Sequence, residues 1–396
     1  MLFFMISKTI HKGYSMYQRI LNLSNLLKNK SYFLFGPRAT GKSTLIKMQF
    51  PNNTPIIDLL QHEMYLRLSV SPGQLESMIM AFDSREIVVI DEVQRVPELL
   101  NEVHRLIENH NIKFLLTGSS ARKLRRNQSN LLAGRARQCE LFPLVFAEIP
   151  NFDLNRYLHF GGMPMIYSSD EPVEDLYAYV NTYLKEEIQA EALVRELPAF
   201  TRFLHYSALT SGEMINFSNI SNDVGVSATT VREYYHLLED TFIGFMLPAW
   251  TKSQKRKAIG KAKFYYFDVG VKNVLSNIKT IDPHSDLYGK AFEHFIICEL
   301  RAYISYRRKQ LTQSYWQSTS GYEVDCVIDD EIAIEIKSTD RVHDKHIKGL
   351  RALSEEEVCK QYFLVSHDEI NRKVDNKFNI IYWKNFLTKL WADEIF

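Results

Sequence analysis

The spacing of hydrophobic residues divides the first third of the chain into short and long segments. Apolar runs rich in β-branched and aromatic residues lie at 32–35, 55–58, 86–91 and 113–118, and longer segments with helical spacing separate them. A strand that helices cover on both faces is apolar along its whole length. The alternation therefore predicts an α/β fold, with a parallel sheet between two layers of helices.

The pattern changes further along the chain. Residues 170–250 are mostly helical in spacing, and from residue 311 onward three strand-like runs precede a helix (345–354) and another strand (361–366). From these changes we expect an N-terminal tail (1–15), an α/β domain (16–150), a helical connector (151–205), a second helical domain (206–280) and a small α/β domain (281–396).

A glycine-rich loop follows the first of the strands. Gly36, Gly41, Lys42 and Ser43 form the pattern G-x-x-x-x-G-K-S between an apolar strand and a predicted helix, which is the context that a phosphate-binding loop requires. The glycines let backbone N–H groups point at phosphates, the helix N-terminus adds its positive dipole end, and the Ser43 hydroxyl binds Mg²⁺. The predicted ATP-binding residues are Gly36, Pro37, Arg38, Ala39, Thr40, Gly41, Lys42, Ser43 and Thr44.

Two acidic residues, Asp91 and Glu92, stand at the end of the strand at 86–91. A buried strand that presents such a pair is the second half of an ATP site. The Asp holds Mg²⁺, directly or through water, and the Glu polarises the attacking water. An acidic pair can also belong to a solvated turn, but the phosphate loop upstream favours the catalytic role.

The strand at 113–118 ends in polar residues. A polar side chain there would lie between the other two strands and orient the lytic water, and we assign this role to Ser119, with Thr117 as second choice. A serine that caps the next helix explains the pattern equally well. Residues 119–138 then hold six basic residues and no acidic one. Arg135 is a candidate arginine finger for a neighbouring subunit, and a basic loop that contacts DNA or solvent is the alternative.

These segments resemble a known family. Five of them are similar to motifs of the bacterial and archaeal predicted AAA+ ATPases: GPRATGKSTL, VVIDEVQRVPELL, LLTGSSARKL, LLAGRARQCELFPL and FGGMP. In that family a P-loop ATPase domain precedes a C-terminal domain of unknown function. The resemblance extends from about residue 16 to at least residue 340. It implies ATP binding and hydrolysis, and a homo-oligomer formed through the ATPase domain.

A helix-turn-helix motif is predicted in the second helical domain. A short helix ends at Gly225, and Ser227 is a favourable N-cap for the next one. Four residues of the second helix recur at helical spacing and face a core: Val231, Tyr234, Tyr235 and Leu238. Its opposite side carries Thr229, Thr230 and Arg232 near the N-terminus, where a recognition helix reaches base edges or phosphates of DNA.

A basic segment follows, between two strand-like runs. It contains six cations and no acidic residue: Lys252, Lys255, Arg256, Lys257, Lys261 and Lys263. A basic β-hairpin after a helix-turn-helix predicts a winged helix whose wing binds DNA phosphates in a strongly salt-dependent way. Winged helices also contact proteins and cover ATPase sites, so the local charge rather than the fold favours DNA.

Three carboxylates and a lysine form a second candidate site. Glu293 lies on a predicted helix, while Glu335 and Lys337 are two residues apart in a predicted strand and so project to the same face. Asp325 joins them from an adjacent antiparallel strand, across the turn at 329–330. Three oxygen ligands suit Mg²⁺ or Mn²⁺, and a lysine beside them steers or deprotonates a metal-bound water.

The order helix, three strands, helix, strand around these residues resembles the core of the PD-(D/E)xK nuclease superfamily, a restriction-endonuclease-like α/β fold. The resemblance implies that Asp325 and Glu335 are the motif acids, Lys337 the motif lysine and Glu293 the helix-borne acid. Val324 stands where the motif has proline. An ordinary strand with outward charges is the alternative, and a fold does not establish its chemistry.

Composition limits the remaining function classes. The chain has 396 residues, 45% hydrophobic and 24% charged, with a net charge of +1, which excludes disordered chains and uniformly basic coat proteins but not local basic patches. No apolar run approaches the roughly 20 residues that cross a bilayer. The MLFFMI start lacks the features of a signal peptide, and the four cysteines are far apart. We therefore expect a cytoplasmic protein with reduced thiols and no membrane partner.

Together these patterns predict a cytoplasmic AAA+ type ATPase that couples its nucleotide state to DNA engagement. Ser43 and Asp91 are the expected Mg²⁺ ligands, and metal-dependent nuclease activity is expected in the C-terminal domain. A second hypothesis is a nucleotide-dependent switch that binds DNA or protein through an inactive nuclease-like domain. A third is a protein-remodelling or defence-type signalling ATPase without a nucleic-acid partner.

Overall fold

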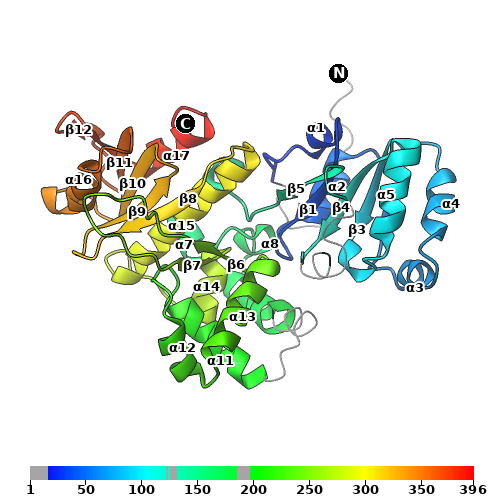
Figure 1. Ribbon diagram of the computed structural model, residues 1–396, viewed down its shortest axis with the longest axis horizontal. Coiled ribbons are helices and arrows are strands. Elements are labelled where there is room, and N and C mark those ends of the chain that lie inside the picture. The colour runs from blue at the N-terminus through cyan, green and yellow to red at the C-terminus, as the bar shows by residue number, and fades with distance from the viewer. Residues whose placement is uncertain (1–16, 122–123, 125–131, 185–196) are drawn as a thin grey trace.

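The computed structural model describes residues 17–121, 124, 132–184 and 197–396. The expected tail over residues 1–15 and much of the basic segment 119–138 lie outside the described residues. Figure 1 shows three parts in chain order: a sheet with helices (blue to cyan), a mainly helical part (green), and a second sheet with helices (yellow to red).

The first part is built on a five-stranded parallel sheet with the order β2-β3-β4-β1-β5. Its strands are β1 (Ser31–Phe35), β2 (Ile56–Asp58), β3 (Ile87–Asp91), β4 (Lys113–Gly118) and β5 (Ala136–Glu140). The predicted fold class is confirmed, and four strands lie where the apolar runs indicated. The fifth, β5, was not predicted. It is an edge strand whose residues are half-buried or exposed, so it lacks an apolar run.

Helices cover both faces of this sheet. Because side chains alternate along a strand, Tyr32 and Leu34 of β1 pack in one buried cluster, and Phe35 packs in another on the opposite face. The helical segments of this part are α1 (Leu23–Leu27), α2 (Lys42–Gln49), α3 (His62–Val70), α4 (Gln74–Met80), η1 (Val93–Arg95) and α5 (Leu99–His110).

The middle part contains the helix-turn-helix at the predicted position. The helix α12 (Phe217–Val224) ends at Gly225, which has a left-handed φ of 78°, and α13 (Ala228–Asp240) follows Ser227, whose side chain caps the N–H of Thr230. The four predicted core residues of α13 are buried: Val231, Tyr234, Tyr235 and Leu238. The other elements are η2 (Phe146–Glu148), α7 (Leu154–Phe160), α8 (Pro164–Tyr167), α9 (Pro172–Ala178), η3 (Tyr179–Leu184), α11 (Leu197–Leu209), β6 (Gly244–Leu247), β7 (Lys263–Tyr266) and α14 (Val269–Leu275).

The last part contains a mixed six-stranded sheet with the order β12-β13-β11-β10-β9-β8. As predicted, the second and third of the strand-like runs form an antiparallel hairpin. The predicted strand after the next helix is parallel to the third. Its elements are α15 (Asp286–Tyr306), β8 (Gln313–Gln317), β9 (Glu323–Ile328), β10 (Ile332–Lys337), η4 (Asp344–Ile347), α16 (Lys348–Ser354), β11 (Gln361–Ser366), β12 (Arg372–Val374), β13 (Phe378–Tyr382) and α17 (Trp383–Trp391).

Helix α15 connects the parts of the molecule and is drawn in yellow in Figure 1. More than half of its 21 residues are buried. Phe292 and Leu300 of this helix share one apolar cluster with Leu141 of the first part and Ile334 of β10. Separating the two sheets would expose this cluster to water, so apolar burial stabilises their arrangement.

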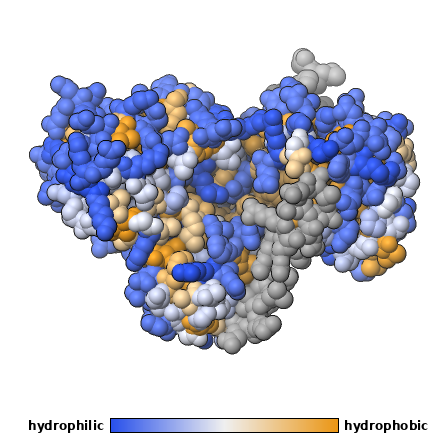
Figure 2. Space-filling view, viewed as in Figure 1, coloured by the Kyte–Doolittle hydropathy of each residue, from blue (hydrophilic) through white to orange (hydrophobic). Residues whose placement is uncertain are grey.

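The surface is mostly hydrophilic on the face seen in Figure 2. An apolar spot lies at the lower right, where Figure 1 places α3, and Leu66 and Val70 of that helix are 47% and 85% exposed. In the part of the chain that the structure describes, no helix is both long and apolar enough to span a bilayer.

Candidate functional site

The phosphate loop lies at the carboxyl edge of the parallel sheet, between β1 and α2. Gly36 has a φ of 144°, and a Cβ atom on it would lie 2.4 Å from the backbone oxygen of Leu141. Gly41, just before α2, has a φ of 94°. Backbone conformation and available space therefore both require glycine at position 36.

A Gly36→Ala variant is expected to unfold at a lower temperature and to bind ATP more weakly, because the new Cβ would push the loop away from Leu141. Thermal unfolding with and without Mg-ATP measures both effects. Gly134→Ala is a matched control, since Gly134 has a φ of 77° but no atom of the described residues within 4 Å of its Cβ position. Equal destabilisation of the two variants would mean that backbone strain alone, and not the contact with Leu141, explains the result.

Lys42 is the first residue of α2 and is buried. Its Nζ donates to the carbonyls of Gly36 and Pro37 at 2.7 and 2.9 Å, and Thr40 Oγ1 donates to the same carbonyl of Pro37 at 2.8 Å. The loop is thus curled around the ammonium group. An ammonium beside a curled loop and a helix N-terminus has the chemistry that binds phosphate groups.

Ser43, Asp91 and Thr117 come together from three elements. Ser43 Oγ on α2 donates to Asp91 Oδ2 at the end of β3, at 3.1 Å, and Thr117 Oγ1 on β4 makes a short hydrogen bond to Asp91 Oδ1. A hydroxyl and a carboxylate next to a phosphate loop are hard oxygen donors of the kind that Mg²⁺ prefers. These residues therefore fit a magnesium-bound nucleotide.

Glu92 lies beside this cluster with a left-handed φ of 59°. Its N–H donates to Thr117 Oγ1 at 3.1 Å. Its carboxylate accepts a short hydrogen bond from Gln94 Nε2 and lies 3.4 Å from Ser119 Oγ. Left-handed residues other than glycine persist where several contacts fix them, often at functional sites. The Thr117 hydroxyl thus contacts the Asp91 carboxylate, and the Ser119 hydroxyl contacts the Glu92 carboxylate, so the two sequence candidates touch different carboxylates.

Arg135 precedes β5 and lies far from the loop of its own chain. Because β5 runs parallel to β1, its N-terminal end is at the sheet edge opposite to the phosphate loop. Arg135 Nε forms an ion pair with Glu108 of α5 at 2.5 Å, and both side chains are partly exposed. An arginine-finger role for Arg135 therefore requires the nucleotide of a neighbouring copy.

The predicted DNA-binding residues of α13 lie on its outer side. Thr229 and Arg232 are exposed, and Thr230 is half-buried because its hydroxyl lies 2.9 Å from that of Ser227. The Arg232 guanidinium stacks over the ring of Phe217, with 4.9 Å between Cζ and the ring centroid. Two of the three predicted residues are thus accessible on the second helix of the motif.

The basic segment between β6 and β7 lies against the C-terminal part instead of projecting as a free wing, while β6 and β7 themselves pair as the predicted β-hairpin. Residues 248–262, which we call the strap, lie along the edge strand β8 of the C-terminal sheet. The backbone N–H of Trp250 donates to Tyr315 O at 2.6 Å, and that of Ile259 donates to Gln317 O at 2.8 Å. Backbone hydrogen bonds therefore hold the strap against β8. No local sequence pattern indicates this pairing, because the two segments are far apart in the sequence.

Most cations of the strap already have acidic partners in the C-terminal part. Lys252 pairs with Asp330 at 2.7 Å and Arg256 with Glu355 at 2.8 Å. Lys255 Nζ lies 3.9 Å from Glu357, while Lys257 is exposed. Lys263 belongs to β7, is buried, and pairs with Glu323 at 2.6 Å. These pairs neutralise much of the charge that predicted a DNA-binding wing.

The carboxylates and the lysine of the C-terminal part come together as predicted. Lys337 Nζ lies 3.3 Å from Asp325 Oδ2 and 2.7 Å from Glu335 Oε1. Glu293 faces them from α15, where its Oε1 accepts a hydrogen bond from Tyr265 at 2.6 Å. Glu293 and Lys337 also line a pocket of about 540 Å³.

The charges in this cluster influence one another. Burial, and then the Asp325 carboxylate, raises the pKa of Glu293 and the pKa of Glu335. Burial opposes the charge of Lys337, but the Asp325 and Glu335 carboxylates outweigh it, so the pKa of Lys337 is raised. The ammonium group of Lys337 therefore stays charged and neutralises its neighbours.

The expected metal site of three carboxylates is not formed. Among the described residues, no three His, Cys, Asp or Glu side chains are arranged to hold a metal ion. The physical reason is that Lys337 Nζ bridges Asp325 and Glu335, while Glu293 is turned toward Tyr265. An ammonium group of the chain itself thus lies between two of the three carboxylates.

Two residues at the nucleotide site were not predicted. Gln94 binds the Glu92 carboxylate and also lies 3.3 Å from Ser119 Oγ. A polar residue in the largely apolar segment after Glu92 is the signal that would have found it. The buried Arg19 donates to the Thr40 carbonyl of the phosphate loop at 2.8 Å. No local pattern indicates Arg19, because its partners lie far away in the sequence.

Family models match three consecutive segments of the chain. Residues 28–150 match an AAA domain, and residues 151–282 and 288–386 match two domains of unknown function, DUF8612 and DUF4143. An uncharacterized protein of Haemophilus influenzae is 26% identical over 231 residues, which are 54% of this chain and 56% of that protein. The chain thus spans little more than half of that relative. An uncharacterized protein of Methanocaldococcus jannaschii is 22% identical over 412 residues, covering 92% of this chain and 89% of that protein.

Two solved structures are similar to the chain at low identity. The Orc1 protein of Aeropyrum pernix in complex with DNA is 12% identical with a TM-score of 0.26, over 63% of this chain and 87% of that chain. The replication initiator DnaA bound to AMPPCP and single-stranded DNA is 11% identical with a TM-score of 0.25, over 55% of this chain and 85% of that chain. TM-scores this low do not establish a shared overall fold. The AAA family match and the phosphate loop on a parallel sheet agree, and they identify residues 28–150 as a P-loop domain of the AAA type.

Proposed function

We propose that the protein binds ATP with Mg²⁺ at the phosphate loop and hydrolyses it. The observation that carries this proposal is the meeting of Lys42, Ser43, Asp91 and Glu92 at one edge of the parallel sheet. Lys42 and the backbone N–H groups of the loop bind the β- and γ-phosphates. The AAA match over residues 28–150 supports the same chemistry.

Each acidic residue has its own role in the proposed reaction. Ser43 and Asp91 hold Mg²⁺, which neutralises phosphate charge when it is bound. Glu92 orients the attacking water and accepts its proton. Thr117 fixes the Asp91 carboxylate and the backbone of Glu92, and Ser119 lies against the Glu92 carboxylate. In an assembly of several copies, Arg135 would stabilise the charge that develops on a neighbour's γ-phosphate.

We further propose that the nucleotide state is coupled to DNA engagement through α13. The part of the chain that carries α13 also contacts the phosphate loop, because the Tyr179 hydroxyl of η3 donates to Arg38 O at 3.4 Å. Thr229 and Arg232 of α13 are exposed. Most cations of the strap are paired with acidic residues. Contacts with DNA phosphates are therefore expected from α13 and from the exposed Lys257.

Incubation of the purified protein with ATP, Mg²⁺ and duplex DNA tests both steps. We expect ADP release that requires Mg²⁺, together with DNA retention on a filter that is stronger at low salt and changes when ATP is added. Absence of ADP release would contradict the proposed ATPase activity. ATP hydrolysis without DNA retention at low salt would instead favour a protein-remodelling ATPase.

A second candidate activity is metal-dependent DNA cleavage by the C-terminal part. The observation that favours it is the meeting of Asp325, Glu335 and Lys337 beside a pocket of about 540 Å³. A divalent cation would compete with the Lys337 ammonium for the same carboxylate oxygens, and carboxylates are the ligands that Mg²⁺ and Mn²⁺ prefer. If the ammonium remains in place, the domain is inactive and the protein acts as a nucleotide-dependent switch.

Strand breakage in the presence of Mg²⁺ or Mn²⁺ distinguishes these two outcomes. Asp325→Ala and Lys337→Ala are each expected to reduce cleavage by at least about 100-fold, because each removes a group that binds the metal or its water. Glu331→Ala, which removes an exposed carboxylate paired with Lys360, is a matched control that should cleave normally. No cleavage by the unmodified protein, or cleavage that survives both substitutions, would exclude the nuclease activity.

A further inference from the structure

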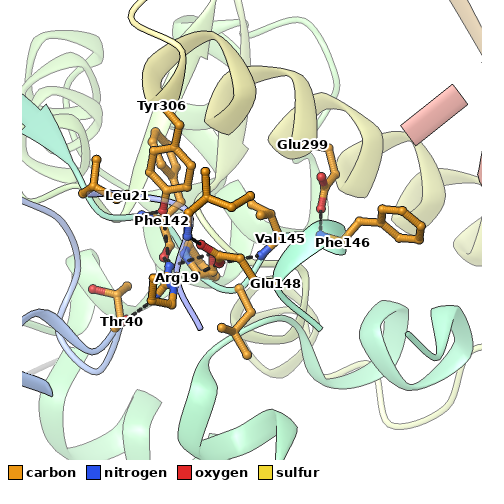
Figure 3. Close-up of polar contacts among 12 residues, drawn as sticks. Arg19, Leu21, Thr40, Phe142, Val145, Phe146, Glu148, Glu299 and Tyr306 are labelled. Atoms are coloured by element: carbon orange, nitrogen blue, oxygen red, sulfur yellow. Dashed lines mark hydrogen bonds and ion pairs between the residues drawn. The ribbon is translucent and has the colours of Figure 1, made fainter. Parts of the chain in front are cut away.

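Arg19 joins three segments that are far apart in the sequence (Figure 3). Its guanidinium donates to Thr40 O of the phosphate loop at 2.8 Å, to Phe142 O after β5 at 2.6 Å, and to the Tyr306 hydroxyl at the end of α15 at 3.2 Å. Arg19 precedes the AAA match, whereas Tyr306 lies in the segment matched by DUF4143. A single side chain therefore contacts the nucleotide loop and the C-terminal part.

The position of this guanidinium is fixed by a buried ion pair. Arg19 Nε lies 2.9 Å from Glu148 Oε2, with side-chain exposures of 5% and 0%. The Glu148 carboxylate also accepts the backbone N–H groups of Ile20 and Val145, at 2.8 and 3.2 Å. A buried charge pair with this many hydrogen bonds has a defined geometry, and removal of one partner is strongly destabilising.

The contact with Thr40 acts on a peptide group of the phosphate loop. In a trans peptide the carbonyl and the N–H point in opposite directions, so the hydrogen bond from Arg19 to Thr40 O also fixes the direction of the Gly41 N–H. Gly41 has a left-handed φ of 94°, and as a glycine it restricts the rotation of this peptide less than other residues would. N–H groups of this loop are the ones expected to bind phosphate.

The contact with Tyr306 brings the C-terminal part into the same network. The Tyr306 hydroxyl accepts from Arg19 and from the backbone N–H of Phe142, both at 3.2 Å. Its pKa is raised by burial, so the hydroxyl stays protonated. Three residues earlier on the same helix, the Tyr303 hydroxyl donates to Asp393 at 2.8 Å, within the C-terminal part.

We propose that Arg19 is a positioning residue of the phosphate loop and that Tyr306 couples its position to the C-terminal part of the chain. The inference rests on the proposed ATP binding and hydrolysis. A shift of α15 would displace the Arg19 guanidinium and with it the Thr40–Gly41 peptide. Binding of Mg-ATP would in turn restrict α15, because linkage between two sites is reciprocal.

A comparison of Tyr306→Phe with Tyr303→Phe tests this proposal. Each substitution removes one hydroxyl from the same helix, but only the first removes a contact with Arg19. We expect Tyr306→Phe to raise the Kd and KM for Mg-ATP about 3- to 10-fold with a smaller change in kcat, since one net hydrogen bond is worth about that factor. Tyr303→Phe should leave the affinity unchanged even where it lowers the melting temperature. Arg19→Lys, which keeps the charge but not the fork of donors, should weaken ATP binding at least as much as Tyr306→Phe.

Hydrogen exchange provides a second readout of the coupling. Mg-ATP is expected to slow amide exchange in α15 of the unmodified protein, and this protection should be reduced in Tyr306→Phe but not in Tyr303→Phe. An unmodified protein that binds no Mg-ATP would overturn the proposed function and this inference together. An active ATPase in which Tyr306→Phe keeps the unmodified affinity and exchange pattern would overturn the inference alone.

Discussion

A Lys42→Ala variant is expected to lose ATP hydrolysis by at least about 100-fold and to bind ATP about 10- to 100-fold more weakly. Lys42 is buried inside the curled loop, where its Nζ now binds the carbonyls of Gly36 and Pro37. The oxygens of a phosphate group in the loop would accept hydrogen bonds from the same ammonium group. Alanine removes this charge from the centre of the loop. ADP release and equilibrium nucleotide binding measure the two effects separately.

Lys47→Ala provides the control for this substitution. Lys47 lies on the same helix α2 but is exposed. Its removal changes the net charge equally without touching the loop, so activity should stay at the unmodified level. Normal turnover by Lys42→Ala would mean that the phosphate loop is not the site of hydrolysis.

A Glu92→Gln variant is expected to bind Mg-ATP normally and to hydrolyse it about 10²- to 10⁴-fold more slowly, which is the usual contribution of a general base. Glutamine has nearly the same shape and still presents an oxygen to the Gln94 amide, but it cannot accept the proton of water. The left-handed backbone at position 92 and its hydrogen bond to Thr117 do not depend on the carboxylate. The effect should therefore appear in kcat while nucleotide affinity is retained.

Glu98→Gln is the matched control, because Glu98 is an exposed glutamate that immediately precedes α5. Single-turnover hydrolysis with radiolabelled ATP separates chemistry from product release in both variants. A Glu92→Gln variant with near-normal turnover would contradict the assignment of Glu92 as the residue that activates water. Loss of binding in the same variant would indicate a structural role instead.

Local sequence patterns predicted those elements that depend on neighbouring residues. Four of the five parallel strands were predicted, because a strand with both faces buried is apolar throughout. The phosphate loop was found because two glycines and the Lys-Ser pair must lie within a few residues of one another to surround a phosphate. Similarly, Ser227 and Gly225 predicted the helix boundaries of the helix-turn-helix, since caps act over a single turn.

Local patterns did not reveal features that depend on distant partners. The strand β5 has no apolar run, because it is an edge strand and is only partly covered. The cations of the strap favoured a DNA-binding wing, which stays a prediction. Only the tertiary structure shows that most of these cations have acidic partners in the C-terminal part, as Lys252 has in Asp330. The three carboxylates near the C-terminus were correctly predicted to meet, yet Lys337 bridges two of them.

The sequence by itself determined the parallel sheet, the phosphate loop and the acidic pair at Asp91 and Glu92, because each of these follows from residues within one strand or one turn. Only the tertiary structure decided which charges remain available and which are already paired. It also showed that Arg19 reaches the Thr40 carbonyl and the Tyr306 hydroxyl at once. The contact with Tyr306 joins residues that are 287 positions apart in the sequence, and no local spacing encodes it.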